Sequence, residues 1–256
     1  MNPIRRYEKI MELLLAAREV TVAELIDQLS VTGKTIREDL AKLEEKGLLH
    51  RIHGGAVLAQ ANQLGILTPR EANDPSAAER GEIAATAVSL LEPNEVIALD
   101  GGRTTLEVAR LLQDMPLTVV TNDLLIIAVL AHKEKVRLVV PGGYQMRNVL
   151  IGTEAAAYIR RLNISKAFLS TTAVHPEDGF TIYAGESAEI KRAWLETAKT
   201  AYVLADREKF GQGALFTFAA LNEATGIITD SGLPAETAEL YRTKGARQII
   251  RGSEVK

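Results

Sequence analysis

Residues 20–58 read VTVAELIDQLSVTGKTIREDLAKLEEKGLLHRIHGGAVL, and this stretch decides the fold of the first part of the chain. Thr21 and Glu24 have the spacing of a capping box, in which the threonine hydroxyl and the glutamate carboxylate bond to free amides at a helix start. A second helix is predicted over about 33–46, where apolar residues recur at helical spacing. The glycines at 54–55 then predict a tight turn between two short strands. Two helices joined by a short connection and followed by a hairpin are typical of a winged helix-turn-helix.

The chain outside this stretch divides into the rest of that domain, a linker and a larger domain. A helix is predicted over about 5–17, so residues 1–58 should form the complete winged helix-turn-helix. The periodicity fades over 59–79, where glycine, proline, asparagine and aspartate collect, and this segment is interpreted as a linker. Residues 80–256 remain for a second, larger domain.

The larger domain contains short apolar runs separated by amphipathic stretches. Strands that lack polar alternation are covered on both faces, which is typical of a parallel sheet flanked by helices. The runs are residues 96–99, 117–120, 136–140, 167–169, 201–205, 226–228 and 248–250. The predicted fold class is therefore α/β, with an N-terminal winged helix-turn-helix followed by a larger domain built on a mostly parallel sheet.

The composition excludes several classes of protein. The chain has 256 residues, a net charge of -3 and no cysteine, so disulfides and thiolate catalysis are excluded. Its four histidines are scattered along the sequence, and neither a metal site nor a cofactor is expected. No apolar run reaches the roughly 20 residues that span a bilayer, and the N-terminus lacks the apolar stretch of a signal peptide. A cytoplasmic protein without a membrane partner is expected.

Polar residues follow nearly every predicted strand of the larger domain. Because the carboxyl ends of parallel strands share one edge of the sheet, these residues predict a ligand crevice, although each alone is also an ordinary turn or cap residue. Glycines, hydroxyls and helix-start amides can hold a phosphate, with added charge from Arg103 and Lys209, while Asp100, Asn122 and Asp206 are expected to bond ligand hydroxyls. No loop matches a dinucleotide-binding or P-loop motif. The predicted ligand-binding residues are Asp100, Gly102, Arg103, Thr104, Thr105, Thr121, Asn122, Gly142, Gly143, Asp206 and Lys209.

Hydroxyl and charged side chains around the helix predicted over 33–46, and in the hairpin after it, are candidates for contact with DNA. Those on the helix lie off its buried stripe and can reach the major groove, as a recognition helix does. Those in the hairpin lie in the predicted wing, which can contact phosphates. The candidates are Thr32, Lys34, Thr35, Arg37, Arg51 and His53. Acidic and basic side chains balance over 1–57, so DNA binding requires that the basic ones converge on one face.

These motifs make the chain resemble the DeoR family, the deoxyribose-operon-repressor type of bacterial transcriptional regulator. In the first domain the matching text is RRYEKIMELL at 5–14, the stretch at 20–58 and HGGA at 53–56. In the larger domain the matching text is DGGRTT at 100–105, TN at 121–122, PGG at 141–143, DREKFG at 206–211 and ITD at 228–230. The resemblance implies a sensor domain related to ribose-5-phosphate isomerases. It also implies a repressor of a carbohydrate operon that a phosphorylated sugar releases from double-stranded DNA.

Two residues depart from the pattern of that family. Glu38 stands where a second arginine is usual before Asp39, and its charge would repel phosphates unless it faces a cytosine edge or a basic group, or lies away from DNA. Arg103 stands where a small hydroxyl residue is usual, so the identity of the ligand cannot be carried over from relatives.

Two other functions remain open from the residues alone. A sugar-phosphate isomerase-like enzyme needs a carboxylate base and commonly a lysine, and the larger domain offers Asp100, Glu186, Glu189, Lys191, Asp206 and Lys209. Such an enzyme has no need of an attached DNA-binding domain, which favours sensing over catalysis. Alternatively, the larger domain serves only to oligomerise. A homo-oligomer is expected because symmetric operators are read by symmetric proteins.

Overall fold

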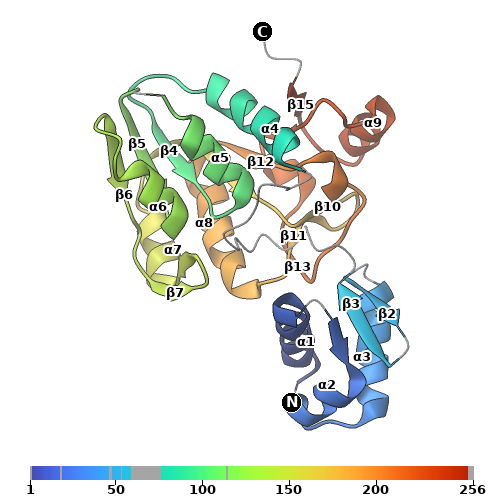
Figure 1. Ribbon diagram of the computed structural model, residues 1–256. Coiled ribbons are helices and arrows are strands. Elements are labelled where there is room, and N and C mark those ends of the chain that lie inside the picture. Colours follow the sequence, from blue (N-terminus) through green and yellow to red (C-terminus); the bar gives the residue numbers. More distant parts are fainter. Residues whose placement is uncertain are drawn as a thin grey trace.

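A computed structural model describes residues 2–17, 19–45, 48–52, 54–58, 76–113 and 115–252. Figure 1 shows a small N-terminal unit, in blue, next to a larger α/β domain. Residues 59–75, which make up most of the predicted linker, lie outside the described residues. The first helix after them begins at Ala77, slightly before the position predicted for the start of the larger domain.

The N-terminal unit consists of three helices and a three-stranded antiparallel sheet in the order β1-β3-β2. Its elements are α1 (Pro3–Ala17), β1 (Glu19–Thr21), α2 (Val22–Leu29), α3 (Gly33–Glu45), β2 (Leu49–Ile52) and β3 (Gly55–Leu58). The predicted capping box is confirmed, since the Glu24 amide donates to the Thr21 hydroxyl and the Thr21 amide donates to the Glu24 carboxylate. The helices and the hairpin therefore form the predicted winged helix-turn-helix.

A buried ion pair joins the first and third helices of this unit. The Arg6 guanidinium on α1 donates to both carboxylate oxygens of Asp39 on α3, at 2.7 and 3.0 Å. Around this pair, Ile10 and Leu14 of α1 pack into the same fully buried cluster as Ile36 of α3. Because a buried bidentate pair fixes geometry as well as charge, α1 and α3 are held in one relative position.

The larger domain is built on a seven-stranded parallel sheet in the order β15-β14-β12-β9-β4-β5-β6. The strands are β4 (Val96–Leu99), β5 (Leu117–Thr121), β6 (Val136–Val139), β9 (Ile164–Ser170), β12 (Ala198–Leu204), β14 (Gly226–Thr229) and β15 (Ile249–Arg251). Each contains or overlaps one of the predicted apolar runs, so the α/β prediction is confirmed. From β4 the next strands, β5 and β6, are added towards one edge of the sheet. From β9 the later strands, β12, β14 and β15, are added towards the other edge.

Helices cover both faces of the parallel sheet, which explains why its strands are apolar throughout. One face packs against α4 (Ala77–Ser89), α5 (Arg103–Leu111) and α6 (Leu124–Leu130), and the other against α7 (Thr153–Ile159), α8 (Ala188–Thr197) and α9 (Ala235–Thr243). In β4, Ile97 and Leu99 belong to the first core and Ala98 to the second, as the alternation of side chains along a strand requires. No helix in the described ranges combines the length and apolar character needed to cross a membrane.

Two small antiparallel elements were not predicted from the sequence. A second sheet consists of β10 (Ala173–His175), β11 (Gly179–Ile182) and β13 (Phe216–Ala219), and a separate hairpin consists of β7 (Tyr144–Met146) and β8 (Val149–Ile151). Their strands have three or four residues, too few for an alternating pattern to stand out. Figure 1 shows β11 and β13 on the side of the larger domain that faces the N-terminal unit.

Candidate functional site

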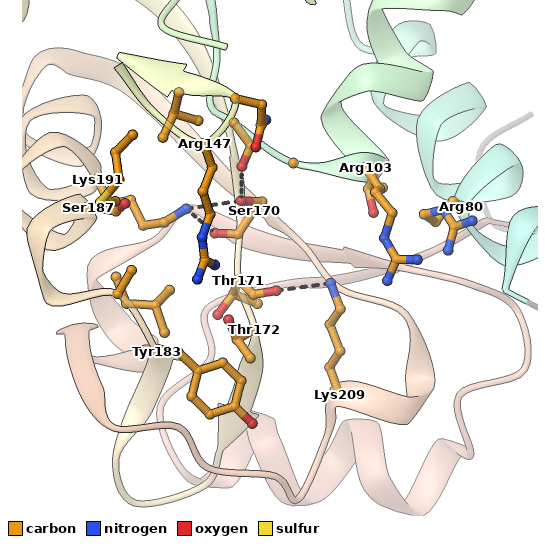
Figure 2. A pocket seen from close by; sticks show the side chains of 18 of the residues that line it. Arg80, Arg103, Arg147, Ser170, Thr171, Thr172, Tyr183, Ser187, Lys191 and Lys209 are labelled. Carbon is orange, nitrogen blue, oxygen red and sulfur yellow. Dashed lines mark hydrogen bonds between the residues drawn. The ribbon is translucent and has the colours of Figure 1, made fainter. Parts of the chain in front are cut away.

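A cavity lies where the carboxyl ends of β4 and β9 meet, and Figure 2 shows its lining. These two strands are neighbours in the sheet, and the connections after them lead in opposite directions. This junction is the topological switch point, where the loops separate and ligands of open α/β sheets bind. The polar and charged lining residues are Arg80, Arg103, Thr104, Arg147, Asn148, Ser170, Thr171, Thr172, Tyr183, Ser187, Lys191, Asp206 and Lys209.

The loop between β4 and α5 forms one wall of the cavity and requires glycine for close packing. A Cβ atom on Gly101 would lie 2.4 Å from a Val149 methyl, and one on Gly102 would lie 2.6 Å from the Ser170 Cβ. The loop can approach β8 and β9 only because these side chains are absent. Gly102 is the N-cap of α5, so the free amides of the first turn of α5 start at the cavity wall beside Thr104, in the arrangement that favours an anion.

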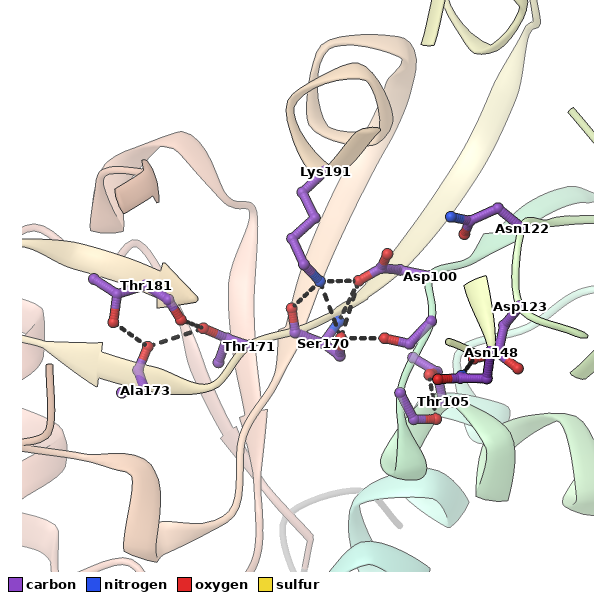
Figure 3. A network of polar contacts seen from close by, with 12 residues as sticks. Asp100, Thr105, Asn122, Asp123, Asn148, Ser170, Thr171, Ala173, Thr181 and Lys191 are labelled. Atoms are coloured by element: carbon purple, nitrogen blue, oxygen red, sulfur yellow. Dashed lines mark hydrogen bonds and ion pairs between the residues drawn. The ribbon is translucent and has the colours of Figure 1, made fainter. Parts of the chain in front are cut away.

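A buried network of hydrogen bonds holds Lys191 at the floor of the cavity (Figure 3). The Lys191 ammonium pairs with the Asp100 carboxylate and also donates to the Ser170 carbonyl and hydroxyl oxygens at 2.7 and 3.0 Å. The Ser170 amide donates to the same Asp100 carboxylate at 3.0 Å. Asp100 is only 4% exposed and is not among the cavity-lining residues, so it holds Lys191 and Ser170 in place instead of reaching a ligand as predicted.

Five of the predicted ligand-binding residues line the cavity, namely Gly102, Arg103, Thr104, Asp206 and Lys209. Of the others, Thr105 and Thr121 are fully buried, and the Thr105 hydroxyl donates to the Gly102 carbonyl. Asn122 is also buried and donates its side-chain amide to the Leu150 carbonyl at 2.9 Å. The structure does not bring these residues to the cavity lining, because strand ends near one another in the sheet do not all face the same space.

The hairpin formed by β7 and β8 accounts for most of these differences. The Leu150 amide of β8 donates to the Asn122 carbonyl, and the Asn148 side chain donates to the Asp123 carboxylate at 2.5 Å. The hairpin thereby covers the end of β5. Gly142 and Gly143 lie in the connection from β6 and do not line the cavity, and a Cβ atom on Gly143 would lie 2.3 Å from the Ile151 carbonyl oxygen.

Several lining residues were not among the predicted ligand-binding residues. Ser170, Thr171 and Thr172 follow the predicted run at 167–169, so their position at a strand end was a usable signal. Arg147 comes from the turn of the unpredicted hairpin. Arg80 comes from α4 and does not follow a predicted strand in the sequence. No local pattern pointed to these two arginines.

Most of the charged side chains that line the cavity are cationic. Among the described residues, five cationic side chains and one carboxylate, that of Asp206, line it. The Lys209 ammonium donates to the Thr171 carbonyl at 2.9 Å and lies 3.9 Å from the Asp206 carboxylate. Burial lowers the pKa of Lys209, and the charges of Arg103 and Arg80 lower it further, although Asp206 acts in the opposite direction. A bound anion would offset this repulsion. Within the described residues, no three His, Asp or Glu side chains are grouped as a metal site requires.

The predicted DNA-contact residues differ in their exposure and in their hydrogen bonds within the protein. Arg37 and Lys34 are exposed on α3, and Lys34 lies 4.0 Å from Glu38 one turn later. Thr32 precedes α3, and its hydroxyl accepts from the Thr35 amide, as a helix cap does. Arg51 is bonded through its side chain and its amide to Glu44, at 2.6 and 2.8 Å. His53 lies outside the described residues.

Two family models match the chain, one for each of its two domains. Residues 6–62 match the family model for the DeoR-like helix-turn-helix domain, and residues 76–231 match that for the DeoR C terminal sensor domain. The chain belongs to the DeoR family. Members of the DeoR family are transcriptional regulators, so the chain is a regulator and not an enzyme.

Relatives of this DeoR-family protein match it along nearly its whole length. An uncharacterized HTH-type transcriptional regulator FruR of Bacillus subtilis is 35% identical over 96% of this chain and 98% of its own. An L-fucose operon activator of Haemophilus influenzae is 34% identical over 90% of this chain and 92% of its own. A lactose phosphotransferase system repressor of Staphylococcus epidermidis is 31% identical over 90% of this chain and 93% of its own.

Among solved structures, a ribose 5-phosphate isomerase from Methanocaldococcus jannaschii matches 53% of this chain and 55% of its own, with 17% identity and a TM-score of 0.39. A probable sor operon regulator from Shigella flexneri matches 66% of this chain and 89% of its own, with 14% identity and a TM-score of 0.42. Likeness at this level supports no statement about function.

Proposed function

We propose that this regulator represses a carbohydrate operon and that a phosphorylated sugar, bound in the cavity, releases it from DNA. The observation that carries the proposal is the cationic cavity at the switch point of the sheet, next to the start of α5. Sugar phosphates combine the negative charge and the hydroxyl groups that such a lining would recognise. The relatives named for L-fucose and lactose systems are consistent with a carbohydrate operon.

The phosphate of the ligand would lie against Arg103 and Lys209. Backbone amides at the start of α5 would donate to its oxygens, and the two side chains would add counter-charge. Asp206 would accept from a sugar hydroxyl close by. In this arrangement Asp100 acts indirectly, because it holds the Lys191 ammonium at the floor of the cavity.

The DNA would be contacted mainly by the exposed side of α3. Arg37, Lys34 and Thr35 lie in the first half of α3, whose opposite side is buried through Ile36 and Leu40. Glu38 lies near Lys34, so a basic group close by reduces its repulsion of phosphates. We further infer that the protein acts in the cytoplasm as a homo-oligomer, so that two recognition helices read a symmetric operator.

Helix α1 offers the route by which the ligand would affect DNA binding. Tyr183 lines the cavity and also packs against the core of the N-terminal unit. Met146 and Arg147 likewise line both the cavity and a second hollow, whose other wall is Glu8, Met11 and Glu12 of α1. A ligand that moves these residues would change the surface on which α1 rests, and α1 is bonded to α3 through Arg6 and Asp39.

The proposal is tested by fluorescence anisotropy with labelled DNA from upstream of the protein's own gene. The purified protein is titrated at one fixed salt concentration, since affinity for DNA depends steeply on salt. A panel of phosphorylated sugars is then added, with the unphosphorylated sugars as controls. Tight binding that one phosphorylated sugar alone reverses is the expected result. Binding that no phosphorylated sugar reverses would contradict the assignment of the cavity.

A further inference from the structure

We propose that the ligand of the cavity carries two phosphate groups, one at each end of a sugar. This inference rests on the proposed function and narrows it to a class of effector.

The first group of cations comprises Arg80, Arg103 and Lys209. They come from three separate elements, α4, the start of α5, and the 3-10 turn Arg207–Lys209. Arg80 and Lys209 are buried or largely buried, and both arginines lower the pKa of Lys209 by repulsion. With the amides of α5 beside it, this group has the charge and the donors for one phosphate.

The second group lies on the opposite wall of the cavity and comprises Arg147 and Lys191, with the Ser187 side chain beside them (Figure 2). The Lys191 ammonium is already bonded to Asp100 and Ser170, so most of its charge is matched within the protein. Arg147 is exposed at the tip of the hairpin, and its side chain extends into the cavity. A second anion would therefore be held mainly by Arg147.

The backbone at Arg147 is the observation that most favours a role in binding. Met146 pairs with Val149 across the hairpin, so Arg147 is the first residue of a two-residue turn, and its φ is +58°. This region favours glycine, because a side chain there crowds the backbone. An arginine at this position makes the turn less stable, and its side chain is aimed at the cavity. We infer that the guanidinium serves a ligand.

The placement of the cations also fits two phosphates better than one. A phosphate ester carries a charge of about -1.5 to -2 at neutral pH. Five cations line the cavity on two opposite walls, with Arg80, Arg103 and Lys209 on one and Arg147 and Lys191 on the other. Arg147 also borders the adjoining hollow, whose lining includes Glu8, Glu12 and Glu186. A single phosphate would contact one of the two groups, whereas a bisphosphate would occupy both.

The test is titration calorimetry on the full-length protein with bisphosphates and their matching monophosphates. The probes are the 1,6-bisphosphates of fructose, glucose and tagatose, each compared with its 1- and 6-monophosphate. For one sugar, the bisphosphate should bind about 10- to 100-fold more tightly than either monophosphate, as one added charged contact provides. Arg147→Gly should remove this advantage, so that the bisphosphate and the monophosphate bind that variant with similar affinity.

Asn94→Gly is the matched control for the glycine substitution. Asn94 also has a positive φ, of +68°, but lies before β4, at the opposite end of that strand from the cavity. Both variants should melt at or above the temperature of the parent protein, which shows that the fold is intact, and only Arg147→Gly should change ligand binding.

A bisphosphate that binds no more tightly than a monophosphate would overturn the inference, and so would equal losses for both ligands in Arg147→Gly. In either case, release of DNA by a monophosphate would leave the proposed function standing. If no sugar phosphate of either kind binds, the proposed function fails as well.

Discussion

Replacing Lys191 by methionine tests the buried network beneath the cavity. Methionine keeps most of the side-chain length but removes the ammonium that pairs with Asp100 and bonds to Ser170. The Asp100 side chain is 5% exposed, so its carboxylate would remain buried, keeping the Ser170 amide and hydroxyl as donors but losing its cationic partner. Breaking a buried pair from one side costs about 3–5 kcal/mol. For a domain of this size that corresponds to a melting temperature lower by about 6–20 °C.

Trp194 makes this prediction measurable in the full-length chain. It is the only tryptophan in the sequence, is fully buried and lies one turn after Lys191 on α8. Its fluorescence during urea unfolding therefore reports the sensor domain and not the N-terminal unit. The double variant Lys191→Met with Asp100→Asn should recover most of the loss, because replacing both partners of a buried pair is often nearly neutral. A loss below about 1 kcal/mol in the single variant, or no recovery in the double variant, would refute the reasoning.

Three further predictions concern DNA, phosphate and the coupling between them. Arg37→Ala should weaken operator binding by about 1–3 kcal/mol in anisotropy titrations, whereas Lys42→Ala, an exposed charge in the last turn of the same helix, should not. Because burial lowers the pKa of Lys209, this lysine loses its charge at a lower pH than an exposed lysine does. The affinity for sugar phosphates should therefore fall as the pH rises through the pKa of Lys209. Calorimetry across pH should show this fall absent in Lys209→Arg, since arginine stays charged. Tyr183→Ala should retain binding of both DNA and sugar phosphate but lose release of DNA, and normal release would exclude the route through α1.

The parallel sheet could be predicted because its strands are covered on both faces. In β4, Ile97 and Leu99 face one core and Ala98 faces the other, so the run is apolar without interruption. The hairpin β7–β8 could not be predicted in this way. Its three-residue strands are partly exposed, and Tyr144 is 63% exposed, so they carry no apolar signature.

Site residues that follow strands of the parallel sheet could be predicted from the sequence, whereas those that depend on the hairpin β7–β8 could not. Arg103 and Lys209 lie a few residues after the ends of β4 and β12, and the topology of the sheet brings them to the cavity. Asn122 follows a strand as well, but the hairpin covers it and takes its amide as a donor to Leu150. Arg147 reaches the cavity only because that hairpin folds over the end of β5. Its place therefore depends on a tertiary contact that no local pattern encodes.

Helix α1 touches two parts of the molecule that the chain separates widely. Arg6, near its start, is bonded to Asp39 on α3, and Glu8, Met11 and Glu12 face the loops that line the cavity. If the signal passes along this rigid helix, the covalent link between the domains only has to keep them together. Adding several Gly-Ser units within residues 59–75 should then leave the release of DNA by the ligand unchanged in extent, because the signal would pass through the contact of α1 and not through the linker.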